Sequence, residues 1–85
     1  MTDTHSYKVL YFAWVRESAG VDEDDIALPV GATGDDLKAH LLDVYPALKE
    51  RADKLQLAIN QSHADWSTQL TAGDELAVFP PVTGG

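Results

Sequence analysis

The sequence contains no cysteine in its 85 residues. This absence excludes disulfide bonds, cysteine-ligated zinc and iron–sulfur clusters, and it leaves the chain without an internal thiol nucleophile. Basic residues are also few, because 6 Lys and Arg stand against 14 Asp and Glu, giving a formal net charge of −8. Nucleic acids and anionic membrane surfaces both require clustered cations, so neither is an expected partner. The acidity suits a partner protein with a basic docking surface. Two alternatives account equally well for the negative net charge: it serves solubility alone, or it is an adaptation to a cytoplasm of high salt concentration.

Long apolar runs are missing as well. No stretch approaches the ~20 consecutive apolar residues that a membrane-spanning helix needs. The first six residues, MTDTHS, lack the basic and apolar regions of a signal peptide. We therefore expect a cytoplasmic protein. The length and the hydrophobic content of 45% predict a single domain over residues 1–85, with a flexible C-terminal tail over residues 80–85.

The hydrophobic pattern predicts four strands and one main helix. Strands are expected over residues 7–13, 26–30, 55–60 and 75–79, with a helical turn over 15–19, a solvated acidic turn over 22–25 and a further short strand near Trp66. The main helix is expected to start at the N-cap Thr33, with Asp36 in a capping box, and to end at Pro46. This order is that of an α+β protein with a mixed sheet packed on one main helix, the β-grasp or ubiquitin-like fold.

The first strand has one face that we expect in the core and one that we expect in solvent. Side chains alternate along a strand, and Lys8 marks the solvent face. The expected core face carries Val9, Tyr11 and Ala13. Leu10 and Phe12 then lie on the exposed face, although both are apolar.

The last strand repeats this arrangement. Glu75 marks its solvent face, which places Ala77 and Phe79 there too. If the first and last strands are neighbours, Leu10, Phe12, Ala77 and Phe79 form one exposed apolar patch of the kind that binds partners. A loop that covers one or both rings is the alternative.

The chain ends in Gly84-Gly85. Two glycines leave the terminal carboxylate without neighbouring side chains, so the segment can enter a narrow channel in another protein. The preceding Pro80 and Pro81 restrict φ and favour an extended conformation, and they also end the last strand. The pattern is typical of a tail that serves as the substrate of a partner's active site.

Three segments resemble the small subunit of molybdopterin synthase. The strongest is Gly73–Gly85, GDELAVFPPVTGG, in which Val78 stands where an aromatic residue is common. The opening Val9–Ala13, followed by Arg16-Glu17 and Gly20, is similar to that family's first strand and turn, and Leu57–Gln61 is similar to its middle strand. The resemblance covers nearly the whole chain.

The resemblance implies a sulfur carrier in molybdenum cofactor biosynthesis. An adenylyltransferase related to ubiquitin-activating enzymes would use Mg-ATP to convert the Gly85 carboxylate to an acyl-adenylate, and a persulfide donor would convert that to a thiocarboxylate. The tail would then enter the large subunit of the synthase and donate sulfur to cyclic pyranopterin monophosphate. Two large and two small subunits are the implied assembly. The chain itself is then a non-catalytic subunit that binds no cofactor, with the active-site pocket on the large subunit.

The resemblance and the pattern together assign candidate site residues. Gly85 is the residue whose carboxylate carries the adenylate and then the thiocarboxylate sulfur, and Gly84 is assigned to the same reactive end. The candidate partner-binding residues are Leu10, Phe12, Arg16, His63, Phe79, Pro80, Pro81, Val82 and Thr83. A local ion pair with Glu17 is the simpler interpretation of Arg16. The three histidines lack the spacing of metal ligands, so no metal site is expected.

Three other functions remain open at this point. Certain archaeal ubiquitin-like proteins share the fold and a similar ending, and they attach through the last glycine to lysines of other proteins. The sulfur carrier of thiamine biosynthesis is a second alternative, although it is usually shorter and lacks the Phe-Pro-Pro segment. A plain interaction domain with an incidental tail is the third.

Overall fold

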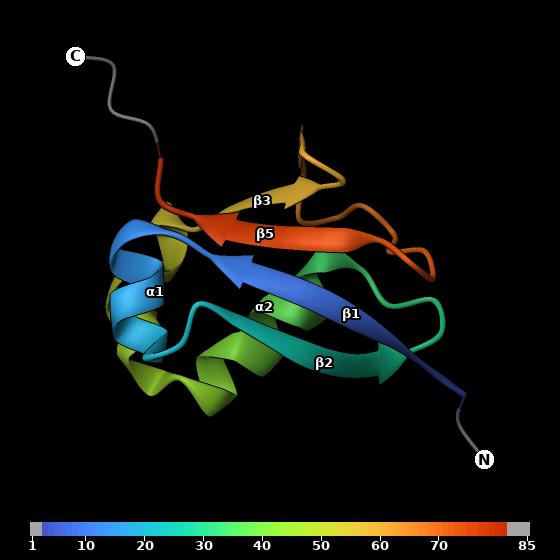
Figure 1. The fold of residues 1–85 in the computed structure, drawn as a ribbon, viewed down its shortest axis with the longest axis horizontal. Coiled ribbons are helices and arrows are strands. Elements are labelled where there is room, and N and C mark those ends of the chain that lie inside the picture. The colour runs from blue at the N-terminus through green and yellow to red at the C-terminus, as the bar shows by residue number, and fades with distance from the viewer. Residues whose placement is uncertain (1–2, 82–85) are drawn as a thin grey trace.

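A mixed five-stranded sheet forms one layer of the protein, and the helices form the other (Figure 1). The computed structural model describes residues 3–81. The elements in chain order are β1 (Thr4–Tyr11), α1 (Ala13–Ala19), β2 (Glu23–Pro29), α2 (Gly34–Val44), the 3-10 segment η1 (Pro46–Lys54), β3 (Gln56–Ile59), β4 (Ser62–Ala64) and β5 (Glu75–Phe79). The expected α+β, β-grasp architecture is confirmed.

The first and last strands are neighbours in the middle of the sheet. The strand order is β2-β1-β5-β3-β4, and β1 runs parallel to β5 with Leu10 opposite Ala77. The pairs β1–β2, β5–β3 and β3–β4 are antiparallel. Because parallel strands end at the same edge of a sheet, the ends of β1 and β5 lie together.

The core lies between the sheet and the helices. Its buried apolar side chains include Tyr7, Val9, Tyr11, Leu37, Leu41, Leu48, Leu57, Leu76 and Val78. The alternation expected for β1 is therefore correct through Tyr11. It is wrong for Ala13, which is exposed and begins α1 with a positive φ of 53°. The chain leaves the sheet there, so the two-residue period no longer applies.

The ends of the helices follow the local sequence signals. The backbone N–H of Thr33 donates a 2.9 Å hydrogen bond to Asp36 Oδ2, which confirms the expected capping box. Pro46 stops α2 after Val44 and begins η1. Gly20 ends α1 with φ of 80°, and its N–H donates to the Arg16 carbonyl at 2.8 Å.

The prediction for the acidic run over residues 22–25 is wrong in the main. Most of it belongs to β2 rather than to a solvated turn, because residues 23–25 pair with β1. β2 is an edge strand, where outward charges are tolerated, and Glu23 forms a 3.3 Å salt bridge with Lys8. Asp24, by contrast, is half-buried. The expected strand near Trp66 is β4, which ends just before it.

Candidate functional site

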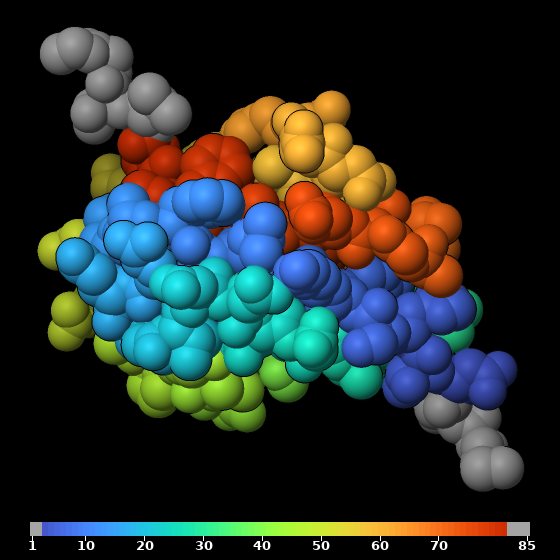
Figure 2. Space-filling model, viewed as in Figure 1, coloured from blue at the N-terminus to red at the C-terminus, as the bar shows by residue number. Residues whose placement is uncertain are grey.

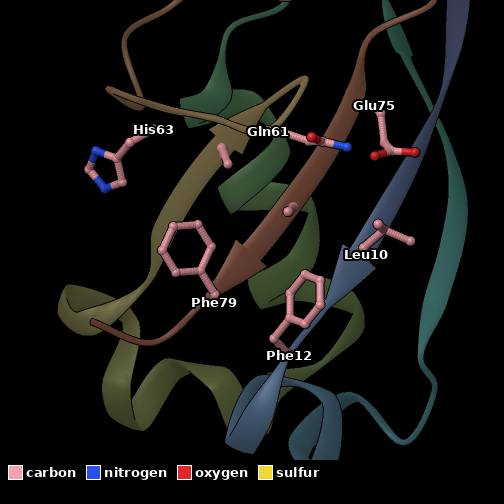
Figure 3. A pocket seen from close by; sticks show the side chains of 8 residues that line it. Leu10, Phe12, Gln61, His63, Glu75 and Phe79 are labelled. Carbon is pink, nitrogen blue, oxygen red and sulfur yellow. The ribbon is translucent and has the colours of Figure 1, made fainter. Parts of the chain in front are cut away.

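An open apolar hollow lies on the face of the sheet that carries no helix (Figure 3). Its volume is about 490 Å³, and its lining comprises Leu10, Phe12, Ala58, Gln61, His63, Glu75, Ala77 and Phe79. All four residues of the expected patch therefore lie on one surface. The parallel pairing of β1 with β5 is what brings them together.

Two phenylalanine rings stand at one end of this hollow (Figure 3). Phe12 is 47% exposed, and Phe79 is half-buried. The backbone N–H of Phe12 donates to the Val78 carbonyl at 3.3 Å, which ties the end of β1 to β5. A large exposed ring on a rigid sheet is a typical anchor for a protein partner.

The rim of the hollow is polar. The His63 ring packs edge-on against Phe79 with 5.9 Å between centroids, and its Nε2 lies 2.9 Å from Gln56 Oε1. Glu75 lies near Gln61, at the end of the hollow opposite the two phenylalanine rings (Figure 3). An apolar centre with a polar rim is the usual anatomy of a protein–protein interface.

Ala58, Gln61 and Glu75 line the hollow but were not among the predicted site residues. Asn60 and Gln61 both have positive φ, 51° and 71°, and they turn the chain from β3 into β4. An asparagine directly after a strand is a signal for such a turn. That signal predicts a hairpin, and the hairpin is what places Gln61 and His63 beside β5.

The last described residues, Pro80 and Pro81, lead away from the sheet next to α1. Figure 2 shows the end of the chain's described part at the surface beside α1. The predicted residues Val82, Thr83, Gly84 and Gly85 lie outside the described residues. Phe12, Phe79 and the two prolines are thus gathered where the tail begins.

Arg16 is not part of this hollow. It lies on α1, and its Nε is 3.8 Å from Asp22 Oδ1 rather than paired with Glu17 as expected. Gly20 reverses the chain after α1 and brings Asp22 back toward the helix. The expected local ion pair with Glu17 is therefore wrong, and the partner-binding role of Arg16 stays a prediction.

A second polar cluster lies at the edge of the core. Asp24 Oδ2 accepts a 2.9 Å hydrogen bond from the Tyr11 hydroxyl and another from the Tyr45 hydroxyl. Burial, followed by the bond to Asp24, raises the pKa of Tyr11. The hydrogen bond to Asp24, followed by burial, raises the pKa of Tyr45 to about 12. Both hydroxyls stay protonated at neutral pH, so the cluster is suited to holding β1, β2 and α2 together.

Neither a metal centre nor a membrane span emerges from residues 3–81. In that range no three His, Asp or Glu side chains are grouped so that they could hold a metal ion. Within the same range, no helix has both the length and the apolar character needed to cross a membrane.

The fold and the exposed face define a β-grasp protein of the ubiquitin-like type. A ubiquitin from Caldiarchaeum subterraneum has the same fold, with a TM-score of 0.64 at 13% identity. Within this class, the chain belongs to the ThiS family, whose model matches residues 9–85.

Curated relatives match almost end to end. The molybdopterin synthase sulfur carrier subunit of Chlamydomonas reinhardtii is 41% identical over 80 residues, covering 92% of this chain and 96% of the relative. The subunit of the same name from Escherichia coli is 42% identical over 80 residues, covering 92% and 98%.

Solved structures of similar proteins also match over more than nine-tenths of this chain. A putative molybdopterin converting factor subunit 1 from Pyrococcus furiosus superposes with a TM-score of 0.83 at 36% identity, covering 92% of this chain and 99% of that one. Small archaeal modifier protein 1 of Haloferax volcanii gives 0.82 at 30%, covering 92% and 99%. A protein–protein complex of subunits 1 and 2 of the molybdopterin-converting factor from Helicobacter pylori contains a chain that gives 0.68 at 26%, covering 94% and 99%.

Proposed function

We propose that this chain is the sulfur carrier subunit of a molybdopterin synthase. The observation that carries the proposal is the similarity to curated sulfur carrier subunits over more than nine-tenths of both chains. The family match runs through Gly85. The expectation drawn from the three sequence segments thus has independent support.

The proposed chemistry takes place at the Gly85 carboxylate. A free carboxylate is a poor acyl donor, so an adenylyltransferase first joins it to AMP from Mg-ATP and releases pyrophosphate. The terminal sulfur of a persulfide donor then displaces AMP. A thiol reductant cleaves the resulting S–S bond and leaves the sulfur on Gly85 as a thiocarboxylate. The thiocarboxylate sulfur then forms a bond to carbon of cyclic pyranopterin monophosphate, and water hydrolyses the acyl–sulfur bond, which leaves the sulfur on the pterin and restores the glycine carboxylate.

The large subunit of the synthase is the proposed partner for the sheet face. In the Helicobacter pylori neighbour, subunits 1 and 2 of the converting factor form a complex. Phe12 and Phe79 offer an apolar anchor next to the first residues of the tail, so docking there would aim Gly85 at the partner's active site. A 2+2 heterotetramer is the proposed assembly. The adenylyltransferase and the persulfide donor are proposed as transient partners.

The test is the intact mass of the protein isolated from its own cells under denaturing, non-reducing conditions. We expect an increase equal to one exchange of oxygen for sulfur, localised by fragmentation to Gly85. Protein from cells that lack the adenylyltransferase is the matched control and should keep the unmodified mass. An unmodified terminus in cells that are actively making the cofactor would contradict the proposal.

A protein-modifier function is the second candidate. It is favoured by the similarity to small archaeal modifier protein 1 of Haloferax volcanii, which has a TM-score of 0.82. In that case the same mass measurement would reveal species of higher mass, joined through Gly85 to lysine side chains of other proteins. The sulfur-carrier proposal predicts that thiocarboxylate is the dominant form.

A further inference from the structure

A second hollow lies at the base of the tail, on the helical side of the sheet. Its lining is Trp14 from α1, Arg51 and Lys54 from η1, and the prolines Pro80 and Pro81. We call these five residues the tail-base pocket. Its volume of about 310 Å³ is enough for a few side chains of a partner.

The charged side chains of the tail-base pocket, Arg51 and Lys54, are both cations. Arg51 is held over the Trp14 ring, with 4.9 Å between the guanidinium carbon and the ring centroid. Such stacking restricts the side chain before any ligand arrives, so less entropy is lost when its N–H groups bind a carboxylate. Within residues 3–81, the salt bridges involve Lys8 and Arg16, and neither Arg51 nor Lys54 takes part in one.

This pocket is unusual for a chain with a net charge of −8. Two of the 6 basic residues line it, and no acidic residue does. The adjoining hollow shares Trp14 and Arg51 but also has Glu17 and Glu50 in its lining. An acidic ligand is therefore repelled from that side and attracted to the side of Lys54 and the prolines.

The pocket adjoins the apolar hollow of the sheet face along the chain at two points. Phe79 of the sheet face is followed directly by Pro80 of the pocket, and Phe12 precedes Trp14 by two residues. Figure 1 shows α1 and η1 close to the point where the chain leaves β5. Both surfaces therefore reach the end of β5, because Phe79 belongs to the hollow and Pro80 to the pocket.

From this geometry we infer that the tail-base pocket binds an acidic segment of the large subunit, with its Asp or Glu carboxylates on Arg51 and Lys54. The inference rests on the proposed function. Apolar contacts on the sheet face then supply most of the binding energy, and the pocket orients the tail. An ion pair beside the point where the tail departs restricts its direction, so the glycine end enters the partner's channel in one orientation.

The test compares two charge reversals in the same element, Lys54→Glu in the pocket and Lys49→Glu outside it. Both variants change the net charge equally, and Lys49 is exposed on η1 and absent from the lining. The dissociation constant for the large subunit of the same organism is measured by titration calorimetry at low salt and at about 0.5 M salt. We expect about tenfold weaker binding for Lys54→Glu at low salt and a change within about twofold for Lys49→Glu. High salt should shrink the difference, because it screens exposed charges.

Two further variants separate charge from packing. Lys54→Arg keeps the charge and should bind like the wild type. Arg51→Glu loses both the charge and the contact with Trp14, so we expect at least the loss seen for Lys54→Glu. Equal affinities of Lys54→Glu and Lys49→Glu, with the wild type binding normally, would overturn the inference and leave the proposed function standing. A wild-type chain that does not bind the large subunit at all would overturn both.

Discussion

The Tyr11 hydroxyl on β1 donates a 2.9 Å hydrogen bond to Asp24 Oδ2 on the edge strand β2. Tyr45, at the end of α2, donates to the same oxygen, and the two tyrosine rings meet edge-on with centroids 6.0 Å apart. One half-buried carboxylate thus joins the edge strand β2, its neighbour β1 and the end of α2. This junction lies on the helical side of the sheet and leaves the opposite, exposed face free for a partner.

Removing one of these hydroxyls should destabilise the fold. For Tyr45→Phe we expect a loss of about 1.5 kcal/mol in the free energy of unfolding, because a hydrogen bond to a charged group is lost. The measurement is urea unfolding followed by fluorescence. Tyr7→Phe is the control, since Tyr7 is 1% exposed and its hydroxyl has no hydrogen-bond partner within the described chain. That variant should be neutral or slightly stabilising, and equal losses in the two variants would contradict the assignment.

The same cluster predicts a pH dependence at the alkaline end. The hydrogen bond to Asp24 raises the pKa of Tyr45 to about 12, whereas an unfolded tyrosine titrates near pH 10. The unfolded state therefore releases its proton first. The contribution to stability is complete below about pH 10 and is lost as the pH rises through about 12. Unfolding free energies measured across this window should fall less steeply in Tyr45→Phe than in the wild type. Parallel curves would show that Tyr45 does not carry the effect.

The exposed side of each strand could be predicted from the sequence because alternation is a local signal, and it placed Leu10 with Phe12 and Ala77 with Phe79. Their union in one patch was conditional on the first and last strands being neighbours, and the parallel pairing of β1 with β5 meets that condition. The role of Asp24 could not be predicted in this way. An acidic run read alone favours a turn, and only pairing with β1 turns Asp24 toward Tyr11. The stack of Arg51 on Trp14 could not be predicted either. It joins η1 to α1, and no sequence pattern relates these two distant segments.

Gly34, the first residue of α2, is needed for close packing. A Cβ there would lie 2.7 Å from Leu57 Cδ2 and 2.7 Å from the Trp66 carbonyl oxygen. Gly34→Ala must therefore displace β3 or the segment after β4, and we expect a loss of about 2 kcal/mol or more in stability. Gly31→Ala is the matched control, because its positive φ of 90° is strained for alanine but a Cβ there meets open space. Its loss should be nearer 1 kcal/mol. Chemical denaturation of both variants measures the two losses in unfolding free energy. A larger loss for Gly31→Ala than for Gly34→Ala would contradict the prediction and show that backbone strain outweighs the clash.

Phe12 should matter more for binding than for folding. Its ring is 47% exposed, so Phe12→Ala should change the unfolding free energy by less than about 1 kcal/mol. If the sheet face binds the large subunit, loss of this exposed ring should weaken binding by about 10- to 100-fold. Val44→Ala is the control, since Val44 is 48% exposed on α2 and lies outside the hollow. Calorimetry with the large subunit gives both values, and equal affinities for the two variants would rule out this face as the docking surface.

The two terminal glycines should be essential for sulfur transfer and dispensable for folding. Any side chain at position 84 adds bulk next to the reacting carboxylate, so Gly84→Val should block entry into the partner's channel. Deletion of Gly85 moves the carboxylate back by one residue and out of reach of the partner's catalytic groups. We expect both variants to lose molybdopterin synthesis in a reconstituted system of chain, adenylyltransferase, persulfide donor and large subunit, with unchanged thermal unfolding. Thr83→Ser, which alters the tail but keeps both glycines, should retain most of the activity. A Gly85-deleted chain that still restored cofactor synthesis would disprove the role of this terminus.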